Sequence, residues 1–232
     1  TAVQAVTYTV GTGATYRPFE YEAPNKEIVG FDIDLMKAIA KAQGFDVEFV
    51  NTTWSTIFPA LNNGDRDIIM SGITITDKRK QQGVEFTDPL LENVRELLIS
   101  GPHSPKVESA ADLGGKTIFV RPSSSYFESL MAYNQARKEA GEPLIDIQPA
   151  SEVLEDEDLV EMVNAGLLPF IVMDEHKARF WQKIFPKITI HETPVFREGG
   201  VIAWAVRKES PKLLAMLNQQ IKAIRGKATG EE

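Results

Sequence analysis

The stretch from Ser71 to Arg79 contains the residue types that bind an anion. It follows the apolar run Ile68–Met70, which predicts a short buried strand, and it leads into the polar segment Asp77–Gln82, which predicts the first turn of a helix. A chain that leaves a strand in this way presents backbone N–H groups, hydroxyls and a guanidinium at one place, and all of these are hydrogen-bond donors. We expect a carboxylate here, because Arg79 can donate to both oxygens while the helix start adds partial positive charge. In the structural alternative, Thr76 is only the helix N-cap and Arg79 is a solvated residue.

The composition limits the class of partner. The chain has 232 residues, a formal net charge of −8 and a sequence pI of about 5.1, which argues against nucleic acid and against an anionic membrane surface. An anion must therefore be captured by local groups. The absence of Cys excludes disulfides and thiolate chemistry and fits an exported protein. No apolar run reaches membrane-spanning length and no signal peptide precedes Thr1, so we expect a soluble chain in a mature or trimmed form.

Hydrophobic periodicity predicts two successive α/β units. Strand and helix alternate, an order that implies parallel strands joined by right-handed crossovers, with ligands at the carboxyl ends of the strands. Asp32 or Asp34 is expected to cap the first helix, and a polar tail is expected from Lys227 to Glu232. Strands are predicted at Val6–Val10, Val47–Val50, Ile68–Met70, Thr117–Val120, Ile145–Ile147, Phe170–Met173 and Val201–Val206. The first helix is predicted to carry an apolar stripe from Leu35 to Ala40 and to be closed by Gly44, and further helices are predicted at Ser55–Asn63, Ser125–Ala140, Leu154–Ala165, Glu175–Ile184 and from Pro211.

Four motifs occur in succession, at Gly11–Glu20, Gly30–Leu35, Ser71–Arg79 and Phe86–Pro89. Together they resemble the periplasmic amino-acid-binding proteins of ABC importers, solute-binding protein family 3. The resemblance implies an α/β, two-lobed periplasmic-binding-protein-like fold of type II, in which each lobe is a mostly parallel sheet flanked by helices and two hinge strands join the lobes. It implies that residues 1–91 and 197–232 form lobe 1 and that residues 92–196 form lobe 2. In that family the lobes close on a free amino acid.

The resemblance also implies roles for individual residues. Arg79 would pair with the ligand α-carboxylate, and aromatic rings would cover the ligand side chain. A serine loop would provide a second carboxylate contact, and Asp174 would take the α-ammonium. The remaining implied contacts are Thr74, Gly72 and Ser71 beside Arg79, the rings of Tyr16 and Trp54, and the loop Ser123, Ser124 and Ser125.

Each of these residues also has a structural interpretation. Tyr16 and Trp54 fit partly buried ring packing, and Asp174 fits the N-cap of the next helix. The serine loop fits a capping turn. Gly13 stands where binders of basic amino acids in this family carry an acid, so the resemblance disfavours cationic ligands.

The second half of the chain has a further resemblance. The segments Arg121–Leu130, Leu154–Leu159, Met162–Pro169 and Phe180–Trp181 are similar to the solute-binding module of membrane-bound lytic murein transglycosylases. This implies a sensory role, with amino acids or cell-wall peptides as ligands. Arg121 would then favour a second acidic group on the ligand.

Catalytic and cofactor chemistry have little support in the sequence. His103, His176 and His191 are scattered without metal-ligand spacing, so no metal or cofactor is expected. We therefore expect a monomeric, non-enzymatic binding protein for an amino acid or small peptide, periplasmic or membrane-anchored in its full-length form. Its expected partner is an ABC permease or a fused or associated cell-wall enzyme, and not a nucleic acid.

Two alternatives stay open. The first is a dehydratase-like enzyme on the same fold, in which Arg79 holds a substrate carboxylate and Asp174 or Glu198 is the acid or base. The second is a pair of lobes that has lost its ligand and serves as an interaction module.

Overall fold

The computed structural model describes residues 5–229, and these divide into two compact units. Unit 1 comprises residues 1–92 and 201–232, and unit 2 comprises residues 93–200. The chain passes from one unit to the other twice, after residues 92 and 200. From the sequence, we expected the chain to cross between the two lobes after residues 91 and 196.

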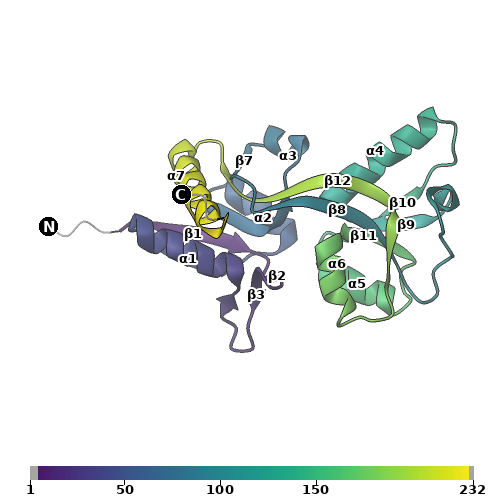
Figure 1. The fold of residues 1–232 in the computed structure, drawn as a ribbon, viewed down its shortest axis with the longest axis horizontal. Helices are drawn as coiled ribbons and strands as arrows, with labels where there is room; N and C mark the ends of the chain where they lie inside the picture. Colours follow the sequence, from purple (N-terminus) through teal and green to yellow (C-terminus); the bar gives the residue numbers. More distant parts are fainter. Residues whose placement is uncertain (1–4, 230–232) are drawn as a thin grey trace. The chain divides into compact units, whose positions relative to one another are not determined.

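Unit 1 is built on parallel strands joined by helices (Figure 1). β1 lies between β5 and β6 and is parallel to both, as the strand–helix alternation predicted. β12 pairs antiparallel with β6 and β7, and in a small separate sheet β3 pairs antiparallel with β2 and β4. The elements are β1 (Thr7–Thr12), β2 (Thr15–Tyr16), β3 (Glu20–Glu22), β4 (Ile28–Val29), α1 (Phe31–Gln43), β5 (Asp46–Asn51), α2 (Trp54–Asn62), β6 (Ile68–Thr74), α3 (Asp77–Gln81), β7 (Val84–Phe86), the end of β12 (Thr189–Arg207) and α7 (Pro211–Thr229).

β6 is buried on both faces of the unit 1 sheet. Ile68 and Met70 pack on one side with α1 and α7, while Ile69 and Ile73 pack on the other side with α2. Successive side chains of a strand point to opposite faces, so an uninterrupted apolar run is what a strand covered on both sides requires. This double burial fixes the carboxyl end of β6, from which the Ser71–Arg79 stretch leaves.

Unit 2 has a core of its own, formed by one continuous cluster of apolar side chains. β9 and β10 are parallel, whereas β8 and β11 are antiparallel. The elements are β8 (Leu91–Ser100), the 3₁₀ helix η1 (Ala110–Leu113), β9 (Thr117–Val120), α4 (Ser125–Glu139), β10 (Asp146–Pro149), α5 (Asp156–Asn164), β11 (Phe170–Asp174), α6 (Glu175–Gln182) and most of β12.

β8 and β12 carry the chain between the units. They are neighbours in one sheet and run side by side in Figure 1. Asn93 has φ 58° and Gly199 has φ 63°, so both take left-handed backbone conformations within two residues of a unit boundary.

Two local predictions were wrong. α1 begins at Phe31 with Gly30 as its N-cap and has no side-chain cap, so neither Asp32 nor Asp34 plays that part. Asp32 is instead buried, and the Trp204 Nε1–H donates to its Oδ2 at 3.4 Å. Within the predicted polar tail, α7 continues through Thr229, and residues 230–232 lie outside the described residues. Among residues 5–229, no helix has both the length and the apolar composition needed to cross a membrane.

Candidate functional site

Arg79 is buried and hydrogen-bonded near the start of α3 in unit 1. Its side chain is only 5% exposed, so the interpretation as a solvated residue is wrong. The Thr76 hydroxyl accepts from the Arg79 backbone N–H at 3.2 Å and caps the helix, and Arg79 Nη1 donates to the Thr74 carbonyl at 2.6 Å. The cap and the carbonyl together set the direction of the guanidinium, which is what a fixed carboxylate anchor needs.

Two aromatic rings of α2 lie against the same guanidinium. The Arg79 Cζ is 5.3 Å from the ring centroid of Trp54 and 5.4 Å from that of Phe58. The rings are one helical turn apart and meet edge to face at 5.6 Å. Cation–π contacts of this kind orient an arginine and exclude water from it. Trp54 was expected to cover a ligand side chain, whereas the structure places its ring beside Arg79. Phe58 was missed.

The other predicted residues of unit 1 lie at the carboxyl ends of β1 and β6. Ser71 Oγ accepts from the Gly13 backbone N–H at 3.3 Å, and Gly72 has φ 59°. A Cβ added at Gly13 would meet Ser71 Oγ at 2.9 Å, so a larger residue there would displace Ser71. Tyr16 is 7% exposed and stacks on Phe19 at 4.7 Å, which is the ring packing given as its structural alternative.

Asp174 is the last residue of β11 in unit 2 and is 1% exposed. It occupies the N-cap position of α6 but its side chain makes no capping hydrogen bond, so capping does not explain it. Its Oδ1 is buried without a hydrogen-bond partner among the described residues, while Lys177 Nζ lies 3.8 Å from Oδ2. Burial raises the pKa of Asp174 to about 7, and the carboxylates of Glu96 and Asp156 add to that rise.

The serine loop at the start of α4 already has partners within unit 2. Ser124 caps α4 by accepting from the Phe127 N–H at 3.2 Å. Glu152 accepts from the Ser123 backbone N–H at 3.0 Å and from its hydroxyl at 2.5 Å. Ser125 Oγ donates to Glu96 at 2.8 Å. A carboxylate of the chain itself therefore occupies donors that the sequence analysis assigned to the ligand.

Arg121 is buried behind the serine loop. Its side chain is 4% exposed, and it donates to the Leu154 carbonyl at 2.8 Å and to Asp156 at 2.5 Å. Lys177 contacts the other oxygen of Asp156 at 3.3 Å. Burial acts to raise the pKa of Asp156, but these two cations outweigh it and the pKa is lowered. Arg121 therefore pairs with Asp156, a carboxylate of its own unit.

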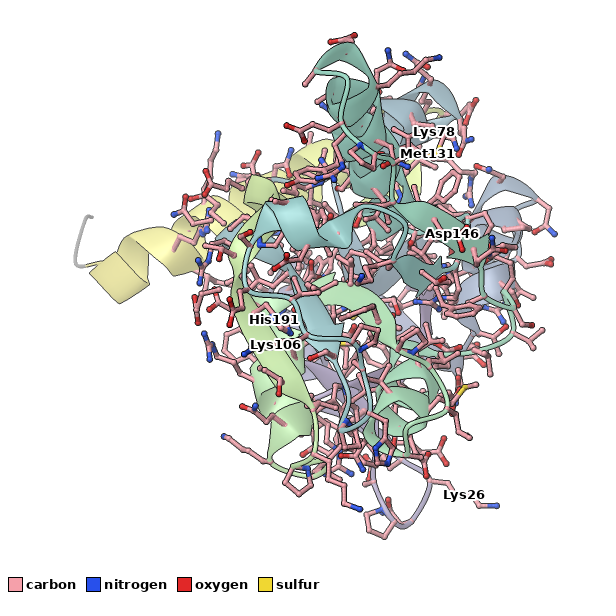
Figure 2. The ribbon with its side chains drawn as sticks, turned by 90° about the vertical axis from the view of Figure 1, so that its right-hand side faces the viewer. Lys26, Lys78, Lys106, Met131, Asp146 and His191 are labelled. Carbon is pink, nitrogen blue, oxygen red and sulfur yellow. The ribbon has the colours of Figure 1, made fainter. Side chains whose placement is uncertain are left out.

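The three histidines do not assemble into a metal site. His191 lies on β12, is labelled in Figure 2, and its Nε2 is 2.7 Å from Ser100 Oγ. Within residues 5–229, no three His, Asp or Glu side chains are grouped as metal ligands would be.

Three residues around Asp174 were not predicted from the sequence. Glu96 is its pairing partner on β8, the Tyr126 hydroxyl accepts from its N–H at 3.1 Å, and Lys177 approaches its carboxylate. Only Lys177 left a local signal, because residues three apart on a helix lie on the same face. The other two reach Asp174 from distant parts of the chain.

The fold and these polar groups define a class of protein. The sequence matches the bacterial extracellular solute-binding proteins, family 3, over residues 8–232, and the chain belongs to that family. The family that the motifs resembled is thereby confirmed, as is the type II periplasmic-binding-protein fold.

Individual relatives agree with this assignment. The chain is 48% identical over 106 residues to a probable histidine-binding protein of Neisseria gonorrhoeae, a match covering 46% of this chain and 38% of that protein. It is 32% identical over 202 residues to a membrane-bound lytic murein transglycosylase F of Desulfosudis oleivorans, covering 87% of this chain and 42% of that protein. Both matches span less than half the length of those relatives.

Among solved structures, the arginine-bound form of truncated ArgBP from T. maritima is similar with a TM-score of 0.78 at 28% identity, covering 94% of this chain and 96% of that one.

Proposed function

We propose that this chain is a non-enzymatic binding protein for a zwitterionic amino acid or small peptide. In the proposal, Arg79 of unit 1 takes the ligand carboxylate and Asp174 of unit 2 takes the ammonium. The observation that carries the proposal is Asp174 Oδ1, a buried carboxylate oxygen without a hydrogen-bond partner among the described residues. A buried carboxylate oxygen without a hydrogen-bond partner is costly, and a charged donor from a ligand removes that cost.

The contacts around Arg79 support the carboxylate half of the proposal. Its guanidinium is buried, directed by the Thr74 carbonyl and flanked by Trp54 and Phe58, so it is preorganised for a planar anion. Ser71, Gly72 and Thr74 are proposed as neighbouring contacts.

The second group of proposed contacts is less direct. We propose that Tyr16 contributes to the ligand site through the packing of its ring. The serine loop would contribute through Ser123, once Glu152 has moved away from the Ser123 hydroxyl. Arg121 would contribute to the site indirectly, through its hydrogen bond to Asp156.

We propose a ligand whose side chain carries no positive charge. Relatives are named as histidine- and arginine-binding proteins, but Gly13 offers no counter-charge here, and Ser71 Oγ occupies the space that a Cβ at Gly13 would need. We further propose a periplasmic location with an ABC permease as partner, because relatives are named as a histidine-binding periplasmic protein and as an ABC transporter arginine-binding protein. The similarity to a lytic transglycosylase keeps sensing of cell-wall peptides as a second use of the same site.

Calorimetry on the parent and four variants tests the two anchors. The titrants are neutral, basic and acidic amino acids together with carboxylic acids that lack the amine. Arg79→Ala should lose at least about 2 kcal/mol of binding free energy, or about thirtyfold in affinity, because the ligand carboxylate loses its buried partner. The control is Lys78→Ala, the exposed neighbour labelled in Figure 2, which should bind as the parent does.

Asp174→Asn should weaken only ligands that carry an ammonium. Equal losses for ligands with and without the amine would contradict the role of Asp174, and unchanged affinity in Arg79→Ala would contradict that of Arg79. A double variant asks whether one ligand engages both groups, because the two losses are then not additive. Tightest binding of arginine would refute the argument from Gly13.

One observation favours the enzyme alternative as a second candidate. Asp174 has a pKa of about 7, which suits a general acid or base in a dehydratase-like reaction on a carboxylic acid held by Arg79. NMR spectra of the bound ligand recorded over hours decide between the candidates. An unchanged ligand supports the binding protein, and a product supports the enzyme.

A further inference from the structure

Four buried or half-buried charges alternate in sign through unit 2. Arg121 contacts Asp156 at 2.5 Å, Lys177 contacts Asp156 at 3.3 Å, and Lys177 lies 3.8 Å from Asp174. The side chain of Lys177 is only 10% exposed. Four elements position this row, because Arg121 follows β9, Asp156 begins α5, Asp174 ends β11 and Lys177 lies in α6.

The position of Lys177 relative to Asp174 is specific. Lys177 lies three residues along the chain, and helical side chains lean toward the N-terminus, so its ammonium returns to the end of β11. There it faces Oδ2 of Asp174, while Oδ1 has no hydrogen-bond partner among the described residues. Asp156 accepts from Lys177 at the shorter distance and holds the ammonium in place.

We propose that Lys177 is a positioning residue that favours the ionised form of Asp174 before ligand binds and leaves Oδ1 open for the ligand ammonium. The inference rests on the proposed function of Asp174 and adds a residue that determines which charge state the site presents. Arg121 supports it indirectly, because it fixes the carboxylate that orients Lys177.

The groups that face Asp174 from the elements packed against it work in opposite directions. Glu96 on β8 and Asp156 on α5 favour the protonated form of Asp174, as burial does. Lys177 on α6 and the Tyr126 hydroxyl on α4 favour the ionised form.

The remaining titratable neighbours do not contact the Asp174 carboxylate directly. Arg197 on β12 lies 3.4 Å from Glu96, and His176 stays neutral near pH 7 because burial lowers its pKa to about 3. Lys177 is therefore the ammonium that opposes the two carboxylates, and its loss should leave Asp174 protonated at neutral pH.

Protonation of Asp174 has a measurable consequence for binding. An ammonium ligand requires the carboxylate, so below the pKa of Asp174 each pH unit should cost about tenfold in affinity. Removal of Lys177 should displace this dependence to higher pH. Above the displaced pKa, the variant should recover the affinity of the parent.

The experiment measures affinity for a neutral amino acid by calorimetry from about pH 5 to about pH 9, the range in which Asp174 should titrate. We expect the profile of Lys177→Met to move upward by at least about one pH unit, with about fivefold weaker binding at pH 7 and about tenfold weaker binding near pH 5. Lys177→Arg, which keeps the charge, should restore the profile of the parent. The control Lys183→Met changes an exposed lysine near the end of α6 and should leave the profile unchanged.

A matched ligand without the amine separates positioning from general damage to the fold. Its affinity should show no displacement in Lys177→Met. If the profiles of Lys177→Met and the parent superimpose for the amino acid, the inference is wrong. If Lys177→Met does not fold, Lys177→Gln removes the charge with a polar side chain and gives the same test.

A measurement on the ligand-free protein distinguishes failure of this inference from failure of the proposed function. The Asp174 carboxyl can be titrated by carbon NMR, with Asp174→Asn providing the assignment. A higher pKa in Lys177→Met supports the inference even if no amino acid binds, and an unchanged pKa overturns it. Absence of amino-acid binding by the parent would refute the proposed function alone.

Discussion

Asp174→Asn should make the ligand-free protein more stable at neutral and alkaline pH. The Asp174 carboxyl is 1% exposed and its pKa is raised to about 7 from an ordinary value of 3.8. In the unfolded chain the same group ionises near its ordinary pKa. Between these two values the folded protein therefore binds more protons, and its stability falls as the pH rises.

The two pKa values give the size of the effect. The interval from 3.8 to about 7 is about three pH units at 1.36 kcal/mol each, or about 4 kcal/mol at most. Above about pH 7 the group is ionised in both states and the loss is complete. Asparagine has nearly the same shape and no charge, so it should abolish this loss.

Urea unfolding at a series of pH values measures the effect as a difference between parent and variant. The difference cancels the titration of groups that are not coupled electrostatically to Asp174. We expect the stability advantage of Asp174→Asn to grow between about pH 4 and about pH 7 and then to stay constant. An advantage that does not change with pH would show that Asp174 titrates normally and would refute this account of the site.

Two further predictions concern neighbouring groups. Glu152→Ala should tighten binding of a carboxylate ligand several-fold, because it frees the N–H and hydroxyl of Ser123; calorimetry against the parent checks this, and an unchanged affinity would remove Ser123 from the site. His176→Gln should make the protein less sensitive to acid between about pH 6 and about pH 3, because burial lowers the pKa of His176 to about 3 and stability is lost as the pH falls through that range. Thermal unfolding at several pH values measures it, and equal slopes for parent and variant would contradict it.

Much of the fold could be predicted because each unit repeats strand and helix with clear periodicity. Pro211 marks the first residue of α7, and Gly44 marks the end of α1 with φ 73°. β12 could not be predicted as one strand of 19 residues. Its first part contains Pro194 and Gly199, which normally interrupt strands, and only its apolar end at Val201–Val206 has a strand pattern.

The candidate site was predictable where one local signal sufficed. Arg79 follows a hydroxyl cap at a strand end, and both features lie within a few residues. The ion pairs of Asp156 were not predictable in this way. Arg121 and Asp156 are separated by 35 residues and Asp156 and Lys177 by 21, so only the folded unit brings them together.

The division of the chain imposes an order on its assembly. Unit 2 is a single uninterrupted segment, residues 93–200, whereas β6 and β7 of unit 1 pair with residues 202–207. The polypeptide is synthesised from its N-terminus, so all of unit 2 has been made before the end of β12, which completes the sheet of unit 1. Until then, β6 and β7 in the first segment of unit 1 have no partner on the side where β12 pairs with them. These exposed strand edges are where a chaperone would be needed most.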